Sequence, residues 1–554
     1  MNILSINYGV HDASACILKD GEVSVYFKEE RLSRIKRDTD PILSIVNCVK
    51  NFNEKIDYVL VISYPNAKKY ARIINKLSNT SIDNLVEFSY NHHLSHASLA
   101  FYNSGFEKSI VIVVDGQGSI FTDSLAECET VYLASYPNNF ECLIKNLSVN
   151  KEHSYFEVDE EFNKKIVPHK NYEYNINEKE GGIVNVYNTA SVLISQGVLE
   201  NGKTMGLSSY GSSNDYPKFF NEKSQPNWNL FTNKNSHERL FKTHENKKTQ
   251  KVTEENYKFY ADYAHEIQTQ TQETVGNLIE KAIEKSECKN VCIVGGYGMN
   301  IVANHYYLQR FPDVEFYFEP NADDGGLPIG AAMLYYHALT KDKTIRPLKT
   351  TSFHGVAYDI SSYKEQTKSV GDVAKIIYQD KSVAVYTGLA EAGQRALGNR
   401  SILFNALNPD AKDLVNKIKN REWYRPFAAM VLEEDASIYF DMGRIKSSTF
   451  MTICFPVRPE YVKIIPGVTH IDNTCRVQTI SQTDGYLYEL LQEFKVLSGH
   501  GILLNTSFNL AGKPLVETPE DAFNTLNNSC LDYLWFEETQ QLFKNKKSMT
   551  LSYK

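Results

Sequence analysis

The chain has 554 residues, with 42% hydrophobic content and a formal net charge of −8. This length allows roughly two to four domains, and the acidic balance excludes a general basic surface for nucleic acid. No run reaches the roughly 18 apolar residues of a membrane span, and the first residues lack a signal-peptide pattern. Nine singly spaced cysteines indicate reduced thiols. We expect a cytoplasmic protein without membrane contact.

The first predicted elements are a strand, a polar turn and a hairpin. NILSINYG predicts the strand, His11 and Asp12 occupy the turn, and ASACILKDGEVSVYFKEER predicts a hairpin closed on Asp-Gly. This order is typical of the start of an actin-like, ATP-handling fold. Ligands bind at turns of this kind, at the carboxyl ends of strands. The alternative is that His11 and Asp12 only cap the turn.

A candidate metal site follows in NHHLSHASLAFYNSGF and KSIVIVVDGQGS. His92 and His96 are four residues apart, about one helical turn, so both imidazoles leave the same helix face. Asp115 ends a short β-branched apolar run, which predicts a buried strand with a carboxylate at its tip. Two imidazoles and one carboxylate can hold a divalent metal. A pair of histidines on a helix can also be capped, solvated or core residues.

The strand-turn-hairpin pattern returns at SIVIVVDGQGS and TDSLAECETVYLASYP. The first part of the chain therefore resembles two copies of one unit facing a cleft. Residues 135–182 are rich in Asn, Lys, Glu and Tyr without sustained periodicity, so we expect an insertion or a set of surface hairpins there. This insertion would interrupt the second copy.

Three further segments punctuated by glycine complete the first part. GKTMGLSSYG predicts a turn in which Lys203 and Gly206 allow close backbone approach to a ligand. A long amphipathic helix over 257–286 leads to the strand NVCIVGG, and GGYGMN (295–300) opens the next helix, where backbone N–H groups favour an anion. NADDGG places Asp323 and Asp324 in a turn before a helix of small residues, as a second carboxylate source.

The character of the sequence changes between about 340 and 355, and we place a domain boundary there, giving domains 1–345 and 350–554. The second domain concentrates cations and hydroxyls in EAGQRALGNRSILF, VNKIKNREWYRPFA, THIDNTCRVQTI and GILLNTSFNLAGKPLV. Forked guanidinium donors suit phosphate and carboxylate oxygens. Taken alone, each Arg is better explained as a surface ion pair, but four such segments in one domain predict an anion pocket. Its candidates are Arg395, Arg400, Lys419, Arg421, Arg425 and Arg476, with Asn505, Thr506 and Ser507.

These segments, together with HDASA, HHLSHA, VVDGQG, MGLSSYG, GGYGMN and DDGGLPIGAA, resemble the O-carbamoyltransferases of the nodulation-factor, cephamycin and tobramycin type. The resemblance runs from Met1 to about Thr518 and is weakest near 135–182 and 212–252. It implies an α/β protein with a duplicated actin-like (Kae-type) domain and a YrdC-like domain. It also implies that the C-terminal domain uses ATP, with Mg²⁺, to convert carbamoyl phosphate to carbamoyl adenylate. The N-terminal cleft, holding a divalent metal, which we expect to be Fe²⁺, would then transfer the carbamoyl group to a hydroxyl.

The resemblance also implies roles for single residues. His11 falls where the family has a candidate general base, and Asp12 stands beside it as a second catalytic candidate. The expected metal ligands are His92, His96, Asp115 and Asp324. The expected carbamoyl phosphate site comprises Arg395, Arg400, Lys419, Arg425, Arg476, Asn505 and Ser507. From the glycine-punctuated segments described above, and not from the resemblance, the expected nucleotide contacts are Lys203, Gly206, Gly295, Gly296 and Asn300.

Two motifs depart from the family's pattern. Gly393-Gln394-Arg395 replaces Gly-Pro-Arg and loses the ring that presets the turn. His470-Ile471-Asp472-Asn473-Thr474 replaces HxDGT, a mild change because Asn tolerates positive φ well.

The sequence leaves open the identity of the acceptor and several alternative functions. An actin-like metabolite kinase would explain the repeat but not the cationic segments, and a tRNA threonylcarbamoyl-type transferase conflicts with the acidic balance. A non-catalytic, nucleotide-sensing scaffold is a further alternative function. As to oligomeric state, the protein could form a homodimer. As the acceptor we place a small hydroxylated metabolite first and a hydroxymethyl-pyrimidine nucleotide or 5-hydroxymethylcytosine DNA second. The aromatic and lysine residues of 135–182 suit stacking on a ring or base, so this segment is the candidate acceptor reader, unless it is only a solvated loop.

Overall fold

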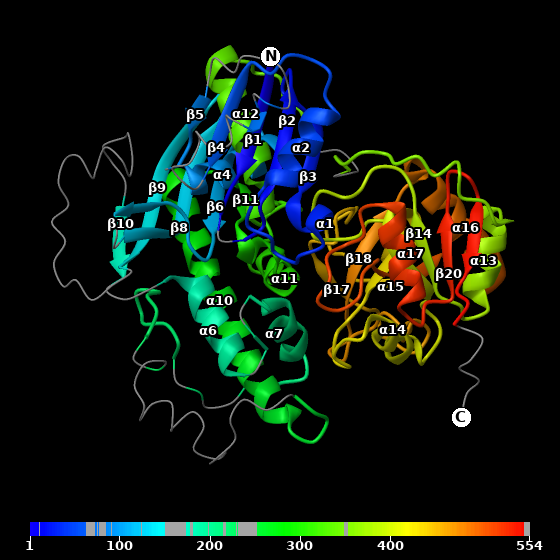
Figure 1. The fold of residues 1–554 in the computed structure, drawn as a ribbon. Helices are drawn as coiled ribbons and strands as arrows, with labels where there is room; N and C mark the ends of the chain where they lie inside the picture. Colours follow the sequence, from blue (N-terminus) through cyan, green and yellow to red (C-terminus); the bar gives the residue numbers. More distant parts are fainter. Residues whose placement is uncertain are drawn as a thin grey trace.

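A computed structural model describes most of the chain. The described residues are 1–9, 11–62, 73–74, 76, 85–89, 91–122, 125–149, 173–177, 181–194, 196–197, 199–213, 216, 218–228, 230, 252–347 and 353–547. In Figure 1 the elements coloured blue to green lie on one side of the molecule, and the yellow to red elements lie beside them.

The first sheet has the order β3-β2-β1-β4-β5. Its strands are β1 (Asn2–Asn7), β2 (Ser14–Lys19), β3 (Glu22–Lys28), β4 (Tyr58–Ile62) and β5 (Leu85–Glu87). The β2–β3 hairpin turns on Asp20 and Gly21, with φ of 50° and 87°. A two-residue turn with positive φ at both positions matches the twist of the strands it joins. The opening strand, turn and hairpin are confirmed.

The second sheet has the order β10-β9-β8-β6-β11-β12, with β7 paired to β8. Its strands are β6 (Lys108–Val114), β7 (Ile120–Thr122), β8 (Leu125–Ser135), β9 (Asn139–Val149), β10 (Glu173–Asn177), β11 (Asn290–Val294) and β12 (Glu315–Phe318).

The two sheets repeat one arrangement. In the first, β1 is antiparallel to the hairpin strand β2 and parallel to β4. In the second, β6 is antiparallel to β8 and parallel to β11. The helices α4 (His92–Ser104) and α12 (Leu327–Thr340) pack against each other. A Cβ at Gly330 would lie 1.9 Å from the Ser95 carbonyl oxygen, so glycine permits this close approach. The duplicated, actin-like arrangement of the first part is confirmed.

Two expectations for this part are wrong. Residues 139–149 are not an insertion: they form β9, which pairs with β8 along its length and is the counterpart of β3. The alternative of a hairpin is met by the β8–β9 pair, but most of the β9 side chains are buried, so it is not a surface hairpin. The alternation of β9 was obscured because both faces carry polar side chains, including buried Lys145. Residue 135 ends β8 and residues 136–138 form the turn into β9. Apart from these, β10 and residues 181–182, the remainder of the expected insertion lies outside the described residues. The segment MGLSSYG is not a turn, because most of it lies in the helix α7 (Asn201–Ser208).

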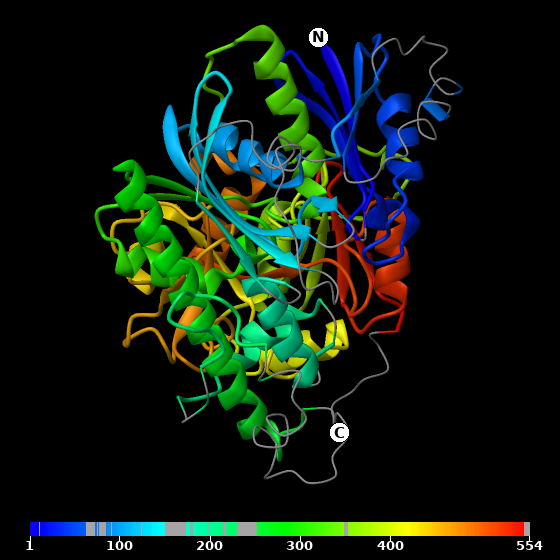
Figure 2. The same ribbon diagram turned by 90° about the vertical axis from the view of Figure 1, so that its left-hand side faces the viewer.

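The other helices of the first part cover the two sheets and include the predicted long helix. They are α1 (Glu29–Ser33), α2 (Ile42–Lys50), α6 (Ile183–Leu193), α10 (Tyr257–Ser286), η1 (Gly296–Met299), α11 (Ile301–Arg310) and η2 (Asp324–Gly326). Figure 2 shows α10 extending away from the sheets on the far side from the N-terminus.

The third sheet is built only from strands after residue 365 and has the order β13-β21-β20-β14-β15-β19-β16-β18-β17. Its strands are β13 (Gln366–Thr367), β14 (Val383–Tyr386), β15 (Arg400–Asn405), β16 (Ala428–Leu432), β17 (Cys454–Pro456), β18 (Thr474–Ile480), β19 (Ile502–Ser507), β20 (Tyr533–Phe536) and β21 (Gln541–Lys544). Its helices are α13 (Val370–Tyr378), α14 (Ala411–Lys419), α15 (Glu433–Tyr439), η3 (Gln482–Asp484), α16 (Tyr486–Ser498) and α17 (Pro519–Asn527). The strands therefore segregate on either side of the expected boundary near 340–355.

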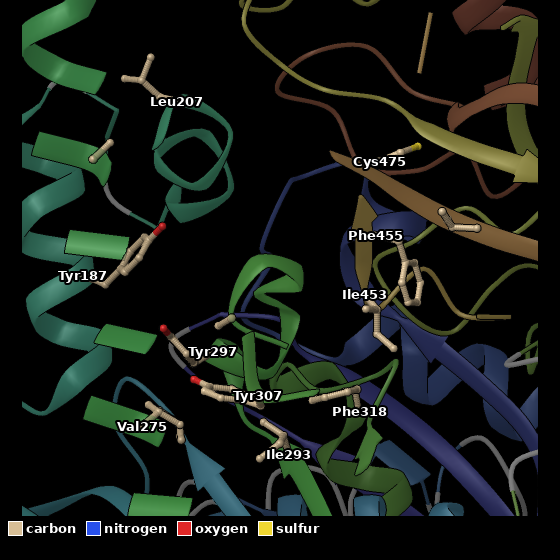
Figure 3. Close-up of a cluster of buried hydrophobic side chains, with 14 of the residues drawn as sticks. Tyr187, Leu207, Val275, Ile293, Tyr297, Tyr307, Phe318, Ile453, Phe455 and Cys475 are labelled. Carbon is tan, nitrogen blue, oxygen red and sulfur yellow. The ribbon is translucent and has the colours of Figure 1, made fainter. Parts of the chain in front are cut away.

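One hydrophobic core joins the first and last parts of the chain. Figure 3 shows Tyr187, Tyr297 and Tyr307 of the first part in one cluster with Phe455 and Cys475 of the last. Burial of apolar surface contributes about 25 cal/mol per Å², so a shared core resists separation of the two parts. Among the described residues, no helix is long and apolar enough to cross a membrane.

Candidate functional site

Four side chains converge where α4, β6 and η2 meet. His92 and His96 lie on one face of α4, Asp115 follows β6, and Asp324 begins η2. The Nε2 atom of His92 is 3.1 Å from Asp115 Oδ2 and 3.5 Å from Asp324 Oδ1. The Nε2 atom of His96 is 3.9 Å and 3.4 Å from the same two carboxylates. One donor atom from each residue fits within a group whose members all lie within 4.8 Å of one another.

The charges of this cluster fit a divalent cation. Burial disfavours the imidazolium of His92, but Asp324 and Asp115 raise its pKa to about 10. Burial would raise the pKa of Asp115, yet the histidines hold it at about 2. Both carboxylates are thus ionised, and a metal would displace the proton from His92. Within the described residues, neither ring nitrogen of buried His96 has a hydrogen-bond partner. An orphaned buried nitrogen facing two carboxylates fits a metal ligand, and the mixed N/O set suits a divalent ion such as iron.

The Gly295-Gly296 pair positions Asp115. The backbone N–H of Gly296 donates to Asp115 Oδ1 at 3.2 Å. Gly295 has φ of 87°, and a Cβ on it would lie 2.4 Å from the Val114 carbonyl oxygen. Only glycine lets the end of β11 approach the end of β6 so closely. These glycines orient a carboxylate in the cluster.

His11 lies beside the cluster and belongs to a network of charged side chains. The Nδ1 atom of His11 is 2.8 Å from Asp12 Oδ2 and 3.9 Å from Asp324 Oδ2. Lys28 Nζ lies 2.7 Å from Asp12 Oδ1 and 2.9 Å from Asp323 Oδ2. Burial alone would lower the pKa of His11, but the hydrogen bond to Asp12 and the charge of Asp324 raise it to about 9. Asp323 thus forms an ion pair with Lys28, whereas the carboxylate of Asp324 faces His92 and His96.

A second buried network supports the loop after β6. The Ser119 hydroxyl accepts a hydrogen bond from the backbone N–H of His92, and the backbone N–H of Ser119 donates to Glu127 at 2.9 Å. Glu127 pairs with Lys145, and both side chains are buried. This network holds the start of α4 against the loop that carries Asp115.

A cluster of cations lies in the C-terminal part. Ala428 on β16 is the register partner of both Asn505 on β19 and Arg476 on β18, so the latter two side chains share one face of the sheet. Within the described residues, buried Arg476 Nε, Arg395 Nε and Asn505 Oδ1 lack hydrogen-bond partners. The two guanidinium Nε–H groups are donors that an anionic ligand would satisfy, whereas the Asn505 oxygen can only accept a hydrogen bond.

The cations of this cluster act on one another. Burial lowers the pKa of Arg395 well below its usual range, and the charges of Arg476 and Arg425 lower it further. Burial, Arg421 and Arg425 do the same for Lys419. Closely spaced buried cations are costly without an anion. An anion bound among them would relieve this repulsion.

Arg400 does not join this cluster. It precedes Ser401, the register partner of Ser507, and therefore lies on the opposite face of the sheet. Its guanidinium donates to the carbonyl oxygens of Gly388 and Thr387 and lies 3.7 Å over the Tyr386 ring. This arginine is fully buried inside the fold. We therefore remove it from the expected carbamoyl phosphate site.

Lys419 and Ser507 are close to each other. Lys419 Nζ donates to the Ser507 hydroxyl at 3.2 Å and to the Asn509 carbonyl oxygen at 2.9 Å. The Lys419 amine is thereby directed toward the end of β19, next to the face of the sheet that carries Arg476 and Asn505.

The short helix η1 links the cation cluster to the histidine-carboxylate cluster. Its first N–H, from Gly296, donates to Asp115. The carbonyl oxygen of its last residue, Met299, accepts a hydrogen bond from Arg395 at 3.3 Å. One four-residue element thus contacts a residue of each cluster.

Comparison with known families decides the identity. The model described as Carbamoyltransferase N-terminus matches residues 63–333, and that described as Carbamoyltransferase C-terminus matches 374–541. Together they cover most of the chain. This chain belongs to the carbamoyltransferase family. It is an enzyme of that class, as the motifs predicted.

Several proteins are similar to all or part of this carbamoyltransferase. Nodulation protein NolNO of Sinorhizobium fredii is 26% identical, covering 95% of this chain and 78% of that protein. Nodulation protein U of Rhizobium tropici is 34% identical, covering 45% of this chain and 42% of that protein. A crystal structure of full-length HypF in the phosphate- and nucleotide-bound form covers 61% of this chain and 56% of that chain, at 14% identity with a TM-score of 0.39.

The expected nucleotide residues of the carbamoyltransferase have contacts within the protein. The Asn300 amide caps α11 through Ala303 and exchanges hydrogen bonds with Gln268. Lys203 pairs with Glu422 at 2.8 Å, and a Cβ at Gly206 would lie 3.2 Å from Pro426. Lys203 and Gly206 therefore brace the loop that bears Arg425, so any nucleotide contact by them stays a prediction.

Sequence reasoning missed Lys28 and the contact that Gln394 makes with Asp323. Lys28 ends the first hairpin on the inward face with Tyr26, and a lysine at an inward strand position was the available signal. The Gln394 side chain donates a hydrogen bond to Asp323 Oδ2. No local pattern could have found that pair, because the two residues come from different parts of the fold.

Proposed function

We propose that this carbamoyltransferase works in two steps at two linked sites. At the cation cluster, water hydrolyses carbamoyl phosphate to carbamate and phosphate, and a carbamate oxygen then attacks the α-phosphorus of ATP with release of pyrophosphate. The product is carbamoyl adenylate. At the histidine-carboxylate cluster, an acceptor hydroxyl attacks the carbamoyl carbon and AMP leaves. The observation that carries the proposal is η1, whose two ends contact Asp115 and Arg395.

The first step rests on charge. Arg395, Lys419, Arg425 and Arg476 offer donors to the phosphate oxygens of carbamoyl phosphate and ATP, with Asn505 and Ser507 as neutral partners. Mg²⁺ would accompany ATP. The buried unpaired donors of Arg395 and Arg476 are the groups that an incoming anion would satisfy.

The second step needs a base and stabilisation of the carbonyl oxygen. A divalent metal held by His92, His96, Asp115 and Asp324, which we assign as Fe²⁺, would supply Lewis-acid stabilisation. His11 lies 3.9 Å from Asp324 and is oriented by Asp12. In the metal-free protein its raised pKa keeps it protonated at neutral pH. Asp12 contributes most to raising this pKa, and a cation in the cluster would offset the further contributions of Asp324 and Asp115, which favours His11 as the acceptor of the hydroxyl proton.

Adjacent sites protect the intermediate. Carbamoyl adenylate hydrolyses in water, so a short internal path favours transfer over loss. The shared core and η1 keep the two sites close.

The acceptor is a small hydroxylated metabolite in the first instance and a hydroxymethyl-pyrimidine nucleotide or DNA in the second. Because 139–149 is the regular strand β9, the candidate acceptor reader narrows to about 150–172, outside the described residues. The test is a mass-spectrometric screen for the carbamoyl mass gain across sugars, nucleosides, nucleotides and hydroxymethylcytosine DNA, repeated with 150–172 shortened. An unchanged acceptor preference would contradict the reader assignment.

The two-step scheme has its own test. Pyrophosphate release from ATP should require carbamoyl phosphate and proceed without an acceptor. If ATP instead yields ADP with a phosphorylated acceptor, the protein acts as an actin-like kinase and the proposal fails.

A further inference from the structure

One loop of the C-terminal part contacts the first part at three points. The guanidinium of Arg31 donates to the carbonyl oxygens of Glu391 and Gly393, the second at 2.7 Å. Next in sequence, the Gln394 amide donates to Asp323 Oδ2, and Arg395 donates to the Met299 carbonyl oxygen. Four of the residues 391–395 therefore form hydrogen bonds with the first part of the chain.

Gln394 differs from its neighbours because its partner is a charged side chain. Asp323 is 8% exposed and already accepts from Lys28, which also holds Asp12. Its other oxygen accepts from the Gly325 backbone N–H at 3.0 Å, which shapes the turn that begins with Asp324. A movement of the Gln394 amide therefore reaches a carboxylate that organises the turn bearing Asp324.

The following residue in the chain belongs to the cation cluster. Arg395 has a buried Nε without a hydrogen-bond partner, and the positive charges of Arg476 and Arg425 repel its guanidinium. An anion that draws the Arg395 guanidinium toward Arg476 would pull on the backbone beside Gln394. Two sites are coupled when each ligand biases the same structural element, and the effect is reciprocal.

We propose that Gln394 is a positioning residue that couples anion binding at the cation cluster to metal binding at the histidine-carboxylate cluster. It acts through Asp323 and contacts neither ligand itself. This inference rests on the proposed function for the location of both sites. The carbamoyltransferase family usually has proline at this position, whose ring presets the turn. In this chain Gln394 takes that position and its side chain forms a hydrogen bond with Asp323 in the first part.

The experiment titrates Co²⁺ into the metal-free full-length protein and follows its visible absorption, with and without sulfate as the anion probe. Mutating a group that hydrogen-bonds to a metal ligand changes the metal affinity roughly 10- to 100-fold. Gln394 is one contact further from the metal, because it acts through Asp323. We therefore expect Gln394→Met to weaken Co²⁺ binding about threefold to tenfold. Sulfate should shift the Co²⁺ affinity of the unaltered protein, and this shift should be largely lost in Gln394→Met. Arg476→Ala should lose it too, because the anion no longer binds.

Two controls separate positioning from a general structural effect. Gln492→Met removes a similar amide-to-carboxylate hydrogen bond, to Glu434 at 3.2 Å, within the C-terminal part, and should leave Co²⁺ binding unchanged. In an Asp323→Asn background, Gln394→Met should add little, since the pair acts as a unit.

The outcomes distinguish this inference from the proposed function. Equal Co²⁺ affinity and sulfate response in Gln394→Met and the unaltered protein would overturn the coupling alone. A full Gln394 effect in the Asp323→Asn background would also overturn it. If the unaltered protein binds no Co²⁺, or binds it equally well after His96→Ala, the proposed metal site fails and this inference fails with it.

Discussion

Lys28→Met tests the buried charge network behind His11. The Lys28 side chain is 3% exposed and lies between two carboxylates, 2.7 Å from Asp12 and 2.9 Å from Asp323. Methionine keeps the length of the side chain and removes its charge. Removing one partner of a buried ion pair costs about 3–5 kcal/mol, because the other charge is left without compensation. We therefore expect the free energy of unfolding to fall by about that amount at pH 7.

The pH dependence of this loss has a definite sign. Burial would raise the pKa of Asp12, but the charge of Lys28 and the hydrogen bond from His11 lower it below its usual range. A carboxyl whose pKa is depressed by folding contributes stability above its unfolded pKa of about 3.9 and loses that contribution as the pH falls further. The difference between Lys28→Met and the unaltered protein should therefore be largest near neutral pH and shrink in acid.

The assay is urea and thermal unfolding at several pH values. Lys19→Met in the neighbouring strand is the matched control, because Lys19 pairs with Glu54 at an exposed position and its loss should change stability little. Adding Asp12→Asn and Asp323→Asn to Lys28→Met removes the uncompensated charges and should restore much of the stability. A loss below about 1 kcal/mol at pH 7, as for a surface pair, or a difference that grows in acid, would refute the reasoning.

Three further outcomes follow from the two clusters. His96→Ala should lower the content of bound divalent metal and abolish carbamoyl transfer while pyrophosphate release persists, and metal analysis showing full occupancy would contradict this. Arg476→Ala should reduce carbamoyl-phosphate-dependent ATP turnover at least tenfold, since loss of a charge-assisted hydrogen bond costs about 1.5–3 kcal/mol; unchanged turnover at low carbamoyl phosphate would exclude it from the anion site. Gly295→Ala places a Cβ 2.4 Å from the Val114 carbonyl oxygen, so it should displace Asp115 and weaken Co²⁺ binding; normal Co²⁺ affinity in a folded variant would show that the backbone there can yield.

Local patterns in the sequence were sufficient for several parts of the site. The spacing of His92 and His96 placed both imidazoles on one face of α4, and the β-branched run before Asp115 predicted β6. The Asp20-Gly21 turn predicted the first hairpin. These features depend on residues close in sequence, where helical and strand periodicities and turn geometry act directly.

Tertiary structure decided the features that depend on register and on distant partners. Arg400 and Ser401 differ by one residue, and one residue of strand register sends a side chain to the opposite face, so composition could not show that Arg400 leaves the cation cluster. The strand β9 was missed because buried Lys145 pairs with Glu127 on the adjacent strand, which only the folded hairpin reveals. Gln394 and Asp323 are 71 residues apart. A contact across that separation arises from the packing of two parts of the chain, and no periodicity within either part encodes it.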